Sequence, residues 1–229
     1  MHGLQFVLEP IVDLTSGRVL GAEMLARVRA DNGAIERPKD LAHELKQSEF
    51  REFLLIESVS RWIKYQKTTE QIPHFASINI NATELASERV VTLLLSMISK
   101  SCSEPSRFRF ELTEDVSQAD VIALRRSAEL LCEHHVGLYI DDFGSGHRPF
   151  AYLTELPVIG FKLDQSLVRQ CVKDSRLRFL VKACAGLARD IRVDIVAEGI
   201  EDYSDELAVL ATGIQKGQGY FYGHPFYPI

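Results

Sequence analysis

Short apolar segments alternate with amphipathic helical segments along most of the chain, and this alternation strongly limits the folds open to it. The apolar segments have the length of buried strands, and the segments between them repeat apolar residues every three or four positions, as helices do. Repeated alternation of strand and helix predicts a parallel sheet with right-handed crossovers, and the count suits a closed barrel better than an open sheet. The predicted strands are residues 6–14, 18–28, 75–80, 108–112, 137–140, 158–163, 194–197 and 217–221. The predicted helices are residues 41–45, 53–65, 83–99, 120–134, 150–155, 174–190 and 202–211.

The first two predicted strands are joined by a short turn at residues 15–17, so they should form a hairpin. The predicted fold is therefore α/β, a single TIM-like (β/α)8 barrel modified by an antiparallel first strand. The chain of 229 residues has no linker rich in Pro, Gly or Ser, and barrels of this kind often reach this length. We expect one domain over residues 1–229.

The composition is that of an ordinary globular protein, with 46% hydrophobic and 25% charged residues. A net charge of −6 argues against a general surface for duplex nucleic acid, which needs a dense basic patch. The longest apolar stretches are too short to span a bilayer, so we expect no membrane segment. The four cysteines form no Cys-x-x-Cys pair and the N-terminus resembles no signal peptide, which predicts a cytoplasmic protein with reduced thiols.

Polar side chains stand at or near the end of nearly every predicted strand, and in barrels the carboxyl ends of the strands form the catalytic face. Strand alternation supports this placement, because Ile78 and Ile80 share one face of their strand and Asn79 belongs to the other. Each residue also has a structural alternative: Asn79 could close a turn, Glu198 could cap a helix, and Lys162 could extend to solvent. The strand-end residues are Glu23, Asn79, Glu111, Asp141, Asp142, Lys162, Glu198 and Gln218.

The apolar strand of residues 137–140 ends in two adjacent carboxylates, Asp141 and Asp142. Such a pair repels unless a cation lies between the groups or protons are taken up, so a divalent metal ion is the simplest explanation. The alternative is a turn in which an aspartate caps the next helix. The acids and the amide at the other strand ends are the further ligands that a metal site would need.

Taken in order, the motifs of the chain resemble those of the EAL domain family, the metal-dependent phosphodiesterases that open the bacterial second messenger cyclic di-GMP to linear pGpG. The resemblance begins at Glu9-Pro10-Ile11-Val12-Asp13 and covers nearly the whole chain. The family's naming motif is similar to Glu23-Met24-Leu25-Ala26-Arg27, with Met24 in place of alanine. The other matching motifs are Ile78-Asn79-Ile80, Glu111-Leu112-Thr113-Glu114, Asp141-Asp142-Phe143-Gly144-Ser145-Gly146, Phe161-Lys162-Leu163-Asp164, Ala197-Glu198-Gly199-Ile200-Glu201 and Gln218-Gly219-Tyr220.

The resemblance implies a site for two divalent ions. Asp141 would bridge the two ions, and Asp142 would help to hold the second. Ligand sets made only of oxygen suit Mg²⁺ or Mn²⁺ rather than zinc. The residues implied as ligands of the first ion are Glu23, Asn79, Glu111 and Asp141.

Three more residues are implied in catalysis by the same resemblance. Lys162 would position the attacking water and oppose developing negative charge. Glu198 would be the general base. Gln218 would orient the nucleophile or Lys162 through a hydrogen bond.

Further residues are implied at the substrate and at a dimer interface. Arg27 shares strand parity with Glu23 and could clamp a substrate phosphate, and the other implied substrate-binding residues are Glu9, Asp164 and Glu201. Glu114 would anchor the loop after Asp142, which in the family links the metal site to a dimer interface. We therefore expect a homodimer through this loop.

Two departures from the family pattern bear on activity. Glu9 stands where the family usually has glutamine, and a carboxylate facing a phosphate should weaken binding unless a metal ion or a proton compensates. The tripeptide His147-Arg148-Pro149 replaces a tyrosine and two small hydroxyl residues in the loop after Asp142. Pro149 removes a donor and should stiffen the start of the next helix, which could alter dimer coupling or turnover.

Two other functions are open to such a chain, and a third is excluded. A catalytically silent EAL domain would bind cyclic di-GMP or a protein partner without cutting the dinucleotide, although this chain keeps every metal ligand of the family pattern. An unrelated barrel hydrolase could use the same metal chemistry, because fold alone does not fix function. The tripeptide Asp142-Phe143-Gly144 also occurs in protein kinases, but the chain has no glycine-rich loop and no His-Arg-Asp motif, which excludes a kinase.

Overall fold

The computed structural model describes residues 4–29, 35–36, 48–69, 73–101, 103–113, 121–145, 149–223 and 225. Eight of its strands form a closed barrel, in the order β1-β9-β8-β7-β6-β5-β4-β2, and the pairing of β1 with β2 closes the ring. A further two-residue strand, β3 (Ile35–Glu36), pairs with β2. The barrel strands are β1 (Leu4–Asp13), β2 (Val19–Arg29), β4 (Ala76–Asn81), β5 (Phe108–Thr113), β6 (Gly137–Phe143), β7 (Gly160–Leu163), β8 (Asp194–Ala197) and β9 (Lys216–Gln218).

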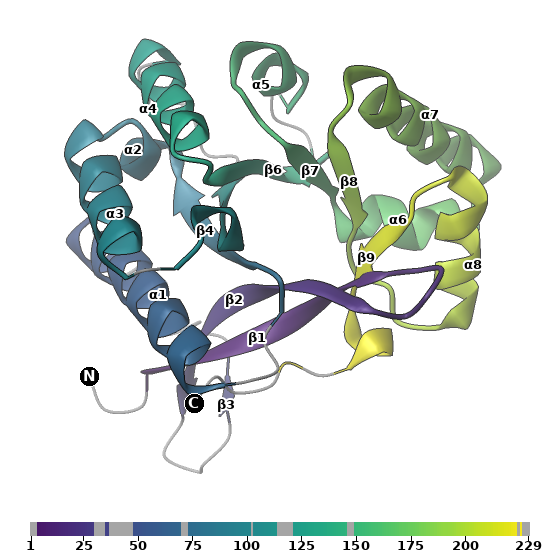
Figure 1. The fold of residues 1–229 in the computed structure, drawn as a ribbon. Helices are drawn as coiled ribbons and strands as arrows, with labels where there is room; N and C mark the ends of the chain where they lie inside the picture. Colours follow the sequence, from purple (N-terminus) through teal and green to yellow (C-terminus); the bar gives the residue numbers. More distant parts are fainter. Residues whose placement is uncertain are drawn as a thin grey trace.

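Strand β1 runs antiparallel to both of its neighbours, β2 and β9, whereas the other neighbouring pairs in the barrel are parallel. The hairpin of β1 and β2 lies across the front of the view in Figure 1. Its register places Glu9 directly opposite Glu23. The predicted α/β barrel with an antiparallel first strand is confirmed.

The helices cover the outside of the barrel (Figure 1). The long helices α1, α3, α4 and α7 supply most of this layer. The short helices α2 and α6 lead from a strand into a long helix, whereas α5 and α8 each join two strands. Two single turns of 3-10 helix, η3 (Pro105–Arg107) and η4 (Tyr220–Tyr222), complete the described elements. The helices are α1 (Ser48–Thr68), α2 (Ala82–Leu85), α3 (Glu88–Lys100), α4 (Val121–Glu133), α5 (Pro149–Glu155), α6 (Gln165–Cys171), α7 (Ser175–Ile191) and α8 (Tyr203–Thr212).

The main hydrophobic core lies between the barrel and this helical layer. Ile78, Ile80 and Phe110 point outward from their strands and belong to the same buried cluster as Trp62 of α1 and Leu94 of α3. Each such side chain, removed from water, stabilises the fold by about 1.5–3 kcal/mol. The outward direction of these apolar residues leaves the alternate, polar positions of the same strands for the inside of the barrel.

A polar network lies inside the barrel near the beginnings of the strands. The hydroxyl of Tyr139 donates a hydrogen bond to Asp194 (2.6 Å) and accepts one from Arg109 (2.8 Å), while Lys216 lies 2.6 Å from the other oxygen of Asp194. Burial would raise the pKa of Asp194, but these donors outweigh it and lower the pKa. Gly160 leaves room for the ring of Tyr139, since a Cβ there would lie 2.4 Å from a ring atom. The network fills the end of the barrel opposite the predicted site.

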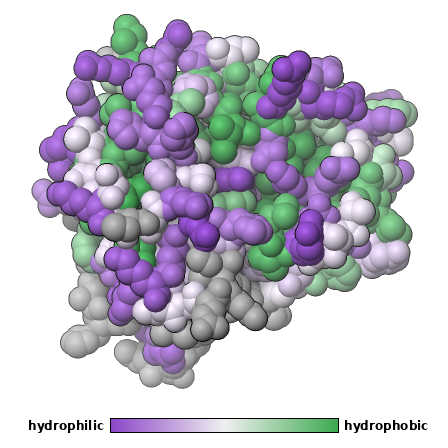
Figure 2. Space-filling model, in the orientation of Figure 1, coloured by the Kyte–Doolittle hydropathy of each residue, from purple (hydrophilic) through white to green (hydrophobic). Residues whose placement is uncertain are grey.

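Polar residues cover much of the face seen in Figure 2, with apolar residues between them. None of the helices among the described residues is both long enough and apolar enough to cross a membrane. Cys132, Cys171 and Cys184 carry free thiols, in agreement with the prediction for these three, and Cys102 lies outside the described residues.

Three elements differ from the prediction, and one predicted helix is not tested. Helix α6 was not predicted; it has only seven residues, and Asp164 caps its N-terminus by accepting from the Ser166 backbone. The predicted helix at 83–99 is two helices, because Asn81 and Glu84 form a capping box for the short helix α2 and the chain then turns before α3. The last strand ends at Gln218 rather than at 221, and the predicted helix at 41–45 lies outside the described residues.

Strand β9 ends just before Gly219, at a position that only glycine fits. This glycine has φ +154°, and a Cβ there would lie 2.1 Å from the backbone oxygen of Ile200. The backbone then turns into η4, and Tyr220 lies at the mouth of the barrel instead of continuing the strand.

Candidate active site

A single lysine forms the centre of the site at the carboxyl ends of the strands. Lys162 of β7 is 1% exposed, and its Nζ donates hydrogen bonds to Glu23 (2.9 Å) and Glu111 (3.0 Å). The same Nζ lies 2.5 Å from Glu198 and 3.5 Å from Asp141. Burial alone would lower the pKa of Lys162, but the four carboxylates outweigh it and raise the pKa. The ammonium is therefore permanently charged at neutral pH.

Glu23 of β2 receives more hydrogen bonds than its neighbours in the site. Its Oε2 accepts from Lys162 and from Gln218 Nε2 (2.7 Å), and its Oε1 accepts from Asn79 Nδ2 (3.1 Å). Burial opposes ionisation, but the charge of Lys162 and the three donors outweigh it and lower the pKa of Glu23. Glu23 is the carboxylate that stays ionised in this cluster.

Glu111 of β5 differs from Glu23 because it has fewer donors. Burial raises its pKa to about 8, with further contributions from the charges of Glu23 and Asp141, although Lys162 opposes this effect. Its Oε1 is buried and has no hydrogen-bond partner, and Oδ1 of Asp141 is in the same state. Buried oxygen atoms without partners are costly, so these two positions favour a ligand that accepts their lone pairs.

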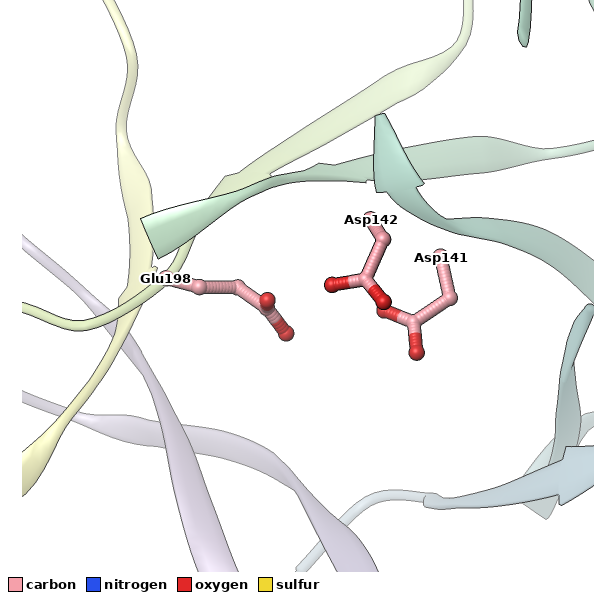
Figure 3. Close-up of side chains that lie close together, drawn as sticks. All are labelled: Asp141, Asp142 and Glu198. Atoms are coloured by element: carbon pink, nitrogen blue, oxygen red, sulfur yellow. The ribbon is translucent and has the colours of Figure 1, made fainter. Parts of the chain in front are cut away.

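An irregularity in β6 turns both adjacent aspartates toward the barrel mouth. Successive residues of a regular strand point to opposite faces, so Asp141 and Asp142 would normally diverge. Here the pairing of β6 with β7 shifts between Ile140 and Phe143, and Asp142 has a left-handed backbone with φ +50°. Figure 3 shows the two carboxylates pointing toward each other and toward Glu198. One oxygen from each of these three residues lies within 4.8 Å of the others.

The residues at the mouth fit a pair of divalent cations. Their donors are carboxylate and amide oxygens, which hard cations such as Mg²⁺ and Mn²⁺ prefer. Four carboxyl groups surround one ammonium, and burial raises the pKa of both Asp141 and Glu198, so further positive charge is needed before all four can ionise. Oε1 of Glu111 has no hydrogen-bond partner, and Oδ1 of Asp141 has only the ion pair with Lys162 at 3.5 Å, so both oxygens have lone pairs to offer to an ion.

A cavity of about 410 Å³ opens directly above this cluster. Its floor includes Glu23, Asp141, Lys162 and Glu198, so a bound ligand would contact the cluster itself. Clefts of this volume hold small organic ligands. The cavity residues outside the cluster include Glu9, Arg27, Gln165, Arg169, Glu201 and Tyr220.

The structure brings most of the predicted site residues together. The cluster contains Glu23, Asn79, Glu111, Asp141, Asp142, Lys162, Glu198 and Gln218. Among the predicted substrate-binding residues, Glu9, Arg27 and Glu201 line the cavity.

Two predicted site residues stand apart from this group. Asp164 is absent from the described residues that line the cavity, because its carboxylate caps α6 at Ser166. Glu114, the predicted loop anchor, lies outside the described residues. Pro149 of the unusual loop tripeptide is the first residue of α5, a position at which proline is favoured, while His147 and Arg148 lie outside the described residues.

The sequence interpretation missed three residues whose polar side chains line the cavity. Gln165 and Arg169 belong to α6, a helix too short to show a clear apolar period, and Tyr220 was assigned to a strand. The signal that could have revealed α6 was Asp164, because aspartate is a common cap of helices. Its carboxylate accepts a hydrogen bond from the backbone of Ser166, two residues further on. Recognising that cap would have predicted α6 and placed Arg169 one turn into the helix.

The chain is similar in sequence to EAL domain proteins. The EAL domain profile matches residues 2–225. A Pseudomonas aeruginosa protein named cyclic di-GMP phosphodiesterase is 28% identical, and the alignment covers 99% of this chain and 39% of that protein. An Escherichia coli protein named probable cyclic di-GMP phosphodiesterase PdeB is 31% identical, and the alignment covers 93% of this chain and 41% of that protein. The chain therefore spans about two fifths of the length of these relatives.

Solved structures of the same fold extend this similarity. The PaMucR phosphodiesterase in complex with c-di-GMP superposes with a TM-score of 0.85 at 25% identity, covering 98% of this chain and 92% of that one. Klebsiella pneumoniae BlrP1, solved with manganese and cyclic di-GMP, has a TM-score of 0.83 at 23% identity. The match covers 98% of this chain and 56% of that one. The profile match over nearly the whole chain, together with the shared barrel, shows that this chain belongs to the EAL domain family.

Proposed function

We propose that this chain is a metal-dependent phosphodiesterase that hydrolyses cyclic di-GMP to linear pGpG and so lowers the level of this second messenger. The observation that supports it most is the buried set of oxygen donors around Lys162, which faces a cavity of about 410 Å³ at the catalytic end of the barrel. The names of two relatives, both cyclic di-GMP phosphodiesterases, support the same substrate. The reaction adds one water, breaks one phosphorus–O3′ bond, and leaves a 5′-phosphate and a 3′-hydroxyl.

We assign the metal ligands as the family resemblance implies. Asp141 would be shared between two ions, and Asp142 and Glu198 lie close enough to serve the second. When bound, two Mg²⁺ or Mn²⁺ ions would neutralise the phosphodiester, lower the pKa of the attacking water and stabilise the leaving oxygen. The ligands assigned to the first ion are Glu23, Asn79, Glu111 and Asp141.

Lys162 and Gln218 would organise the reacting groups. The ammonium of Lys162 contacts Glu23, Glu111 and Glu198, so it sets the positions of three carboxylates and offers positive charge to the transition state. Gln218 donates to the same oxygen of Glu23 as Lys162, which holds that carboxylate in one orientation. Both residues act before any substrate arrives, by preorganising the site.

Glu198 would accept the proton of the attacking water, as the family resemblance implies. Its backbone N–H donates to Leu163 O (3.2 Å), which fixes the residue beside Lys162 at the end of β8. Its carboxylate also lies within 4.8 Å of oxygens of both aspartates, a placement that suits a ligand of the second ion. The two roles predict different effects of substitution.

The rest of the cavity would bind the dinucleotide. Arg27 would contact a substrate phosphate, since guanidinium groups pair well with phosphate oxygens. Glu9 lines the cavity opposite Glu23, where burial and the charge of Glu23 raise its pKa. Glu201 would contact the substrate from the cavity rim, and Asp164 would act indirectly, by fixing the start of α6.

We also propose that the chain forms a homodimer through the loop after Asp142, with Glu114 as the anchor of that loop. The apolar side chain of Phe150, at the start of α5 that follows the loop, is 60% exposed, and Ile122 on α4 is 79% exposed. Such apolar side chains are common at protein interfaces. The free thiols fit a reducing compartment such as the cytoplasm.

Chromatography of cyclic di-GMP after incubation with the purified chain tests this function. We expect conversion to pGpG with Mn²⁺ or Mg²⁺, and no conversion with EDTA. A silent receptor would bind the dinucleotide and leave it intact under every metal condition, and that result would replace the enzymatic assignment.

A further inference from the structure

A second cavity, of about 430 Å³, lies at the end of the barrel opposite the candidate active site. It opens where strands β8 and β9 begin and where helices α7 and α8 end, in a part of the molecule where these four elements pack together (Figure 1). None of the described residues that line it belongs to the candidate active site. Its volume is similar to that of the first cavity, so it could hold a small ligand of its own.

Positive charge exceeds negative charge around this cavity. Among the described lining residues the cations are Lys182, Arg189 and Lys216, and the single acid is Asp194. Lys216 lies 2.6 Å from Asp194 and balances its charge, which leaves the other two cations in excess. The whole chain has a net charge of −6, so this excess is a local feature. Such a cavity attracts anions.

The two cations in excess, Lys182 and Arg189, lie on one face of α7. They are seven residues apart, which is two helical turns or about 10 Å along the axis. Lys182 makes no ion pair within the described part of the chain. Arg189 lies 3.6 Å from its neighbour Asp190, but both side chains are largely exposed, and ion pairs of this kind are weak. Both cations can therefore turn to a ligand at small cost.

Gly186 keeps the space between these two cations open. It lies in the interior of α7, where glycine is less favourable than alanine because it loses more backbone freedom on folding. Outside its own stretch of helix, a Cβ there would meet only Nη2 of Arg189, at 3.8 Å. Ala185 and Ala188 add short side chains to the same wall. This face of the helix is thus a shallow floor with a cation at each end.

The carbonyl groups at the end of α7 reduce this attraction less than they would at an open helix end. The last carbonyls of a helix carry partial negative charge, which repels anions. Here the N–H of Arg192 donates to the carbonyls of Ala188 and Arg189, and the N–H of Val193 also donates to Ala188 (2.9 Å). These bonds occupy the carbonyls nearest the cavity.

We propose that this cavity binds a small anion with more than one phosphate group, held between Lys182 and Arg189. The guanidinium of Arg189 suits two oxygens of one phosphate, and the ammonium of Lys182 suits a second phosphate. Lys216 can add a contact without leaving Asp194, because an ammonium has three donors and Asp194 also accepts from Tyr139 (2.6 Å). No aromatic side chain occurs among the described lining residues, so the phosphates rather than a base supply the recognition.

Calorimetry with inorganic pyrophosphate tests this site on the intact chain, in EDTA and at low salt. We expect one pyrophosphate per chain, bound several-fold more tightly than inorganic phosphate, with a Kd that rises as salt is added. Lys182→Gln and Arg189→Gln each remove one contact with a charged group, so each should raise the Kd roughly 10-fold. A wild-type chain that binds no pyrophosphate, or an unchanged Kd in both variants, would overturn the proposal.

Gly186→Leu distinguishes a shaped cavity from a surface that is merely basic. The leucine fills the floor while every charge stays, and it favours the helix, so the variant should fold and yet bind pyrophosphate at least roughly 10-fold more weakly. Arg176→Gln is the matched control, because it removes an exposed cation from α7 outside the cavity, and it should bind like the wild type. Wild-type affinity in Gly186→Leu, or an equal loss in Arg176→Gln, would contradict a site in this cavity.

Two further measurements separate this site from other places where phosphate could bind. Arg27→Gln removes a cation from the first cavity and should leave the Kd unchanged, whereas loss of binding in this variant would assign the anion to that cavity and refute the proposal. Vesicles of phosphatidylcholine and phosphatidylglycerol present phosphate on a lipid, and the chain should not sediment with them. Sedimentation that Gly186→Leu abolishes would overturn the assignment to a free anion. Because pyrophosphate binding is measured without metal or dinucleotide, its failure leaves the proposed function standing.

Discussion

The ammonium of Lys162 lies 3.0 Å from Oε2 of Glu111, while the other oxygen of the same carboxylate is buried without a hydrogen-bond partner. Lys162 thus has too few hydrogen-bond donors for all of the carboxyl groups around it. The oxygen without a partner and the raised pKa values of the surrounding acids describe a site that is incomplete until a cation adds positive charge. The predictions below follow from this imbalance.

The stability of the metal-free protein should fall as pH rises. The pKa of Glu111 in the fold is about 8, above its ordinary value of 4.5, because burial and neighbouring acids disfavour its charge. Its contribution to stability is therefore complete below pH 4.5 and is lost as pH rises through about 8. Thermal unfolding in EDTA should show a lower Tm at pH 9 than at pH 6. Glu111→Gln should flatten this dependence, and an equally steep dependence in that variant would exclude Glu111 as its source.

Metal binding should release protons, because carboxyl groups with raised pKa values must ionise to bind a cation. Mn²⁺ affinity should therefore increase as pH rises through about 8. Calorimetry in two buffers with different ionisation enthalpies measures the released protons directly. Identical heats in the two buffers at pH 7 would mean that the site is already ionised.

Glu198→Gln separates the roles of base and ligand. If Glu198 is only the general base, the glutamine variant should lose much of its kcat and keep its affinity for Mn²⁺. If Glu198 is a ligand of the second ion, the same variant should bind one of the two ions roughly 10-fold more weakly or worse. Titration of Mn²⁺ by calorimetry and steady-state kinetics on the same variant distinguish the two outcomes.

Glu9→Gln should strengthen substrate binding. Glu9 lies in the cavity wall beside Glu23, where an added negative charge repels the phosphates of a dinucleotide. The glutamine keeps the size of the side chain and removes the charge, so the Kd for cyclic di-GMP in Ca²⁺ buffer should decrease several-fold. An unchanged or weaker affinity would show that Glu9 does not face a phosphate.

Glu23→Ala and Asp141→Ala should each abolish metal-dependent turnover while the barrel still folds. Removing either acid reduces the repulsion among the carboxylates around Lys162, which offsets part of the lost contacts. Glu23→Ala should be the less stable variant, because three donors lose their acceptor. Wild-type activity in either variant would contradict the ligand assignment, and circular dichroism would confirm the fold.

Asp194→Asn should destabilise the barrel without affecting the chemistry. It weakens the contacts with Tyr139 and Lys216 at the far end of the barrel, at a cost of about 1–2 kcal/mol at pH 7. The pKa of Asp194 is lowered from 3.8, so its contribution is present above that value and is lost as pH falls below it. The difference in unfolding free energy should therefore vanish in acid, whereas kcat/KM at pH 7 should match the wild type.

The barrel could be predicted from the sequence because its determinants are periodic. Alternation within strands placed Ile78 and Ile80 outward and Asn79 inward, and the structure confirms this for both isoleucines. The order of the elements then brought the strand-end residues to one face. Rules that depend only on position along a strand or helix were sufficient for this part of the site.

The rest of the site depends on geometry that no such rule contains. The sequence predicts that Asp141 and Asp142 lie together, but their shared direction comes from an irregular pairing and the left-handed backbone of Asp142. The ion pair of Arg169 and Glu201 depends on α6, whose seven residues are too few for a periodic signal. Both features arise from local departures from regular structure.

Anomalous diffraction from crystals of the chain grown with saturating Mn²⁺ tests the central assignment most directly. We predict two manganese peaks about 3.5–4 Å apart, bridged by Asp141. One should lie among Glu23, Asn79 and Glu111, and the other beside Asp142 and Glu198. An absence of peaks at the mouth of the barrel, or ions bound by other residues, would contradict the account.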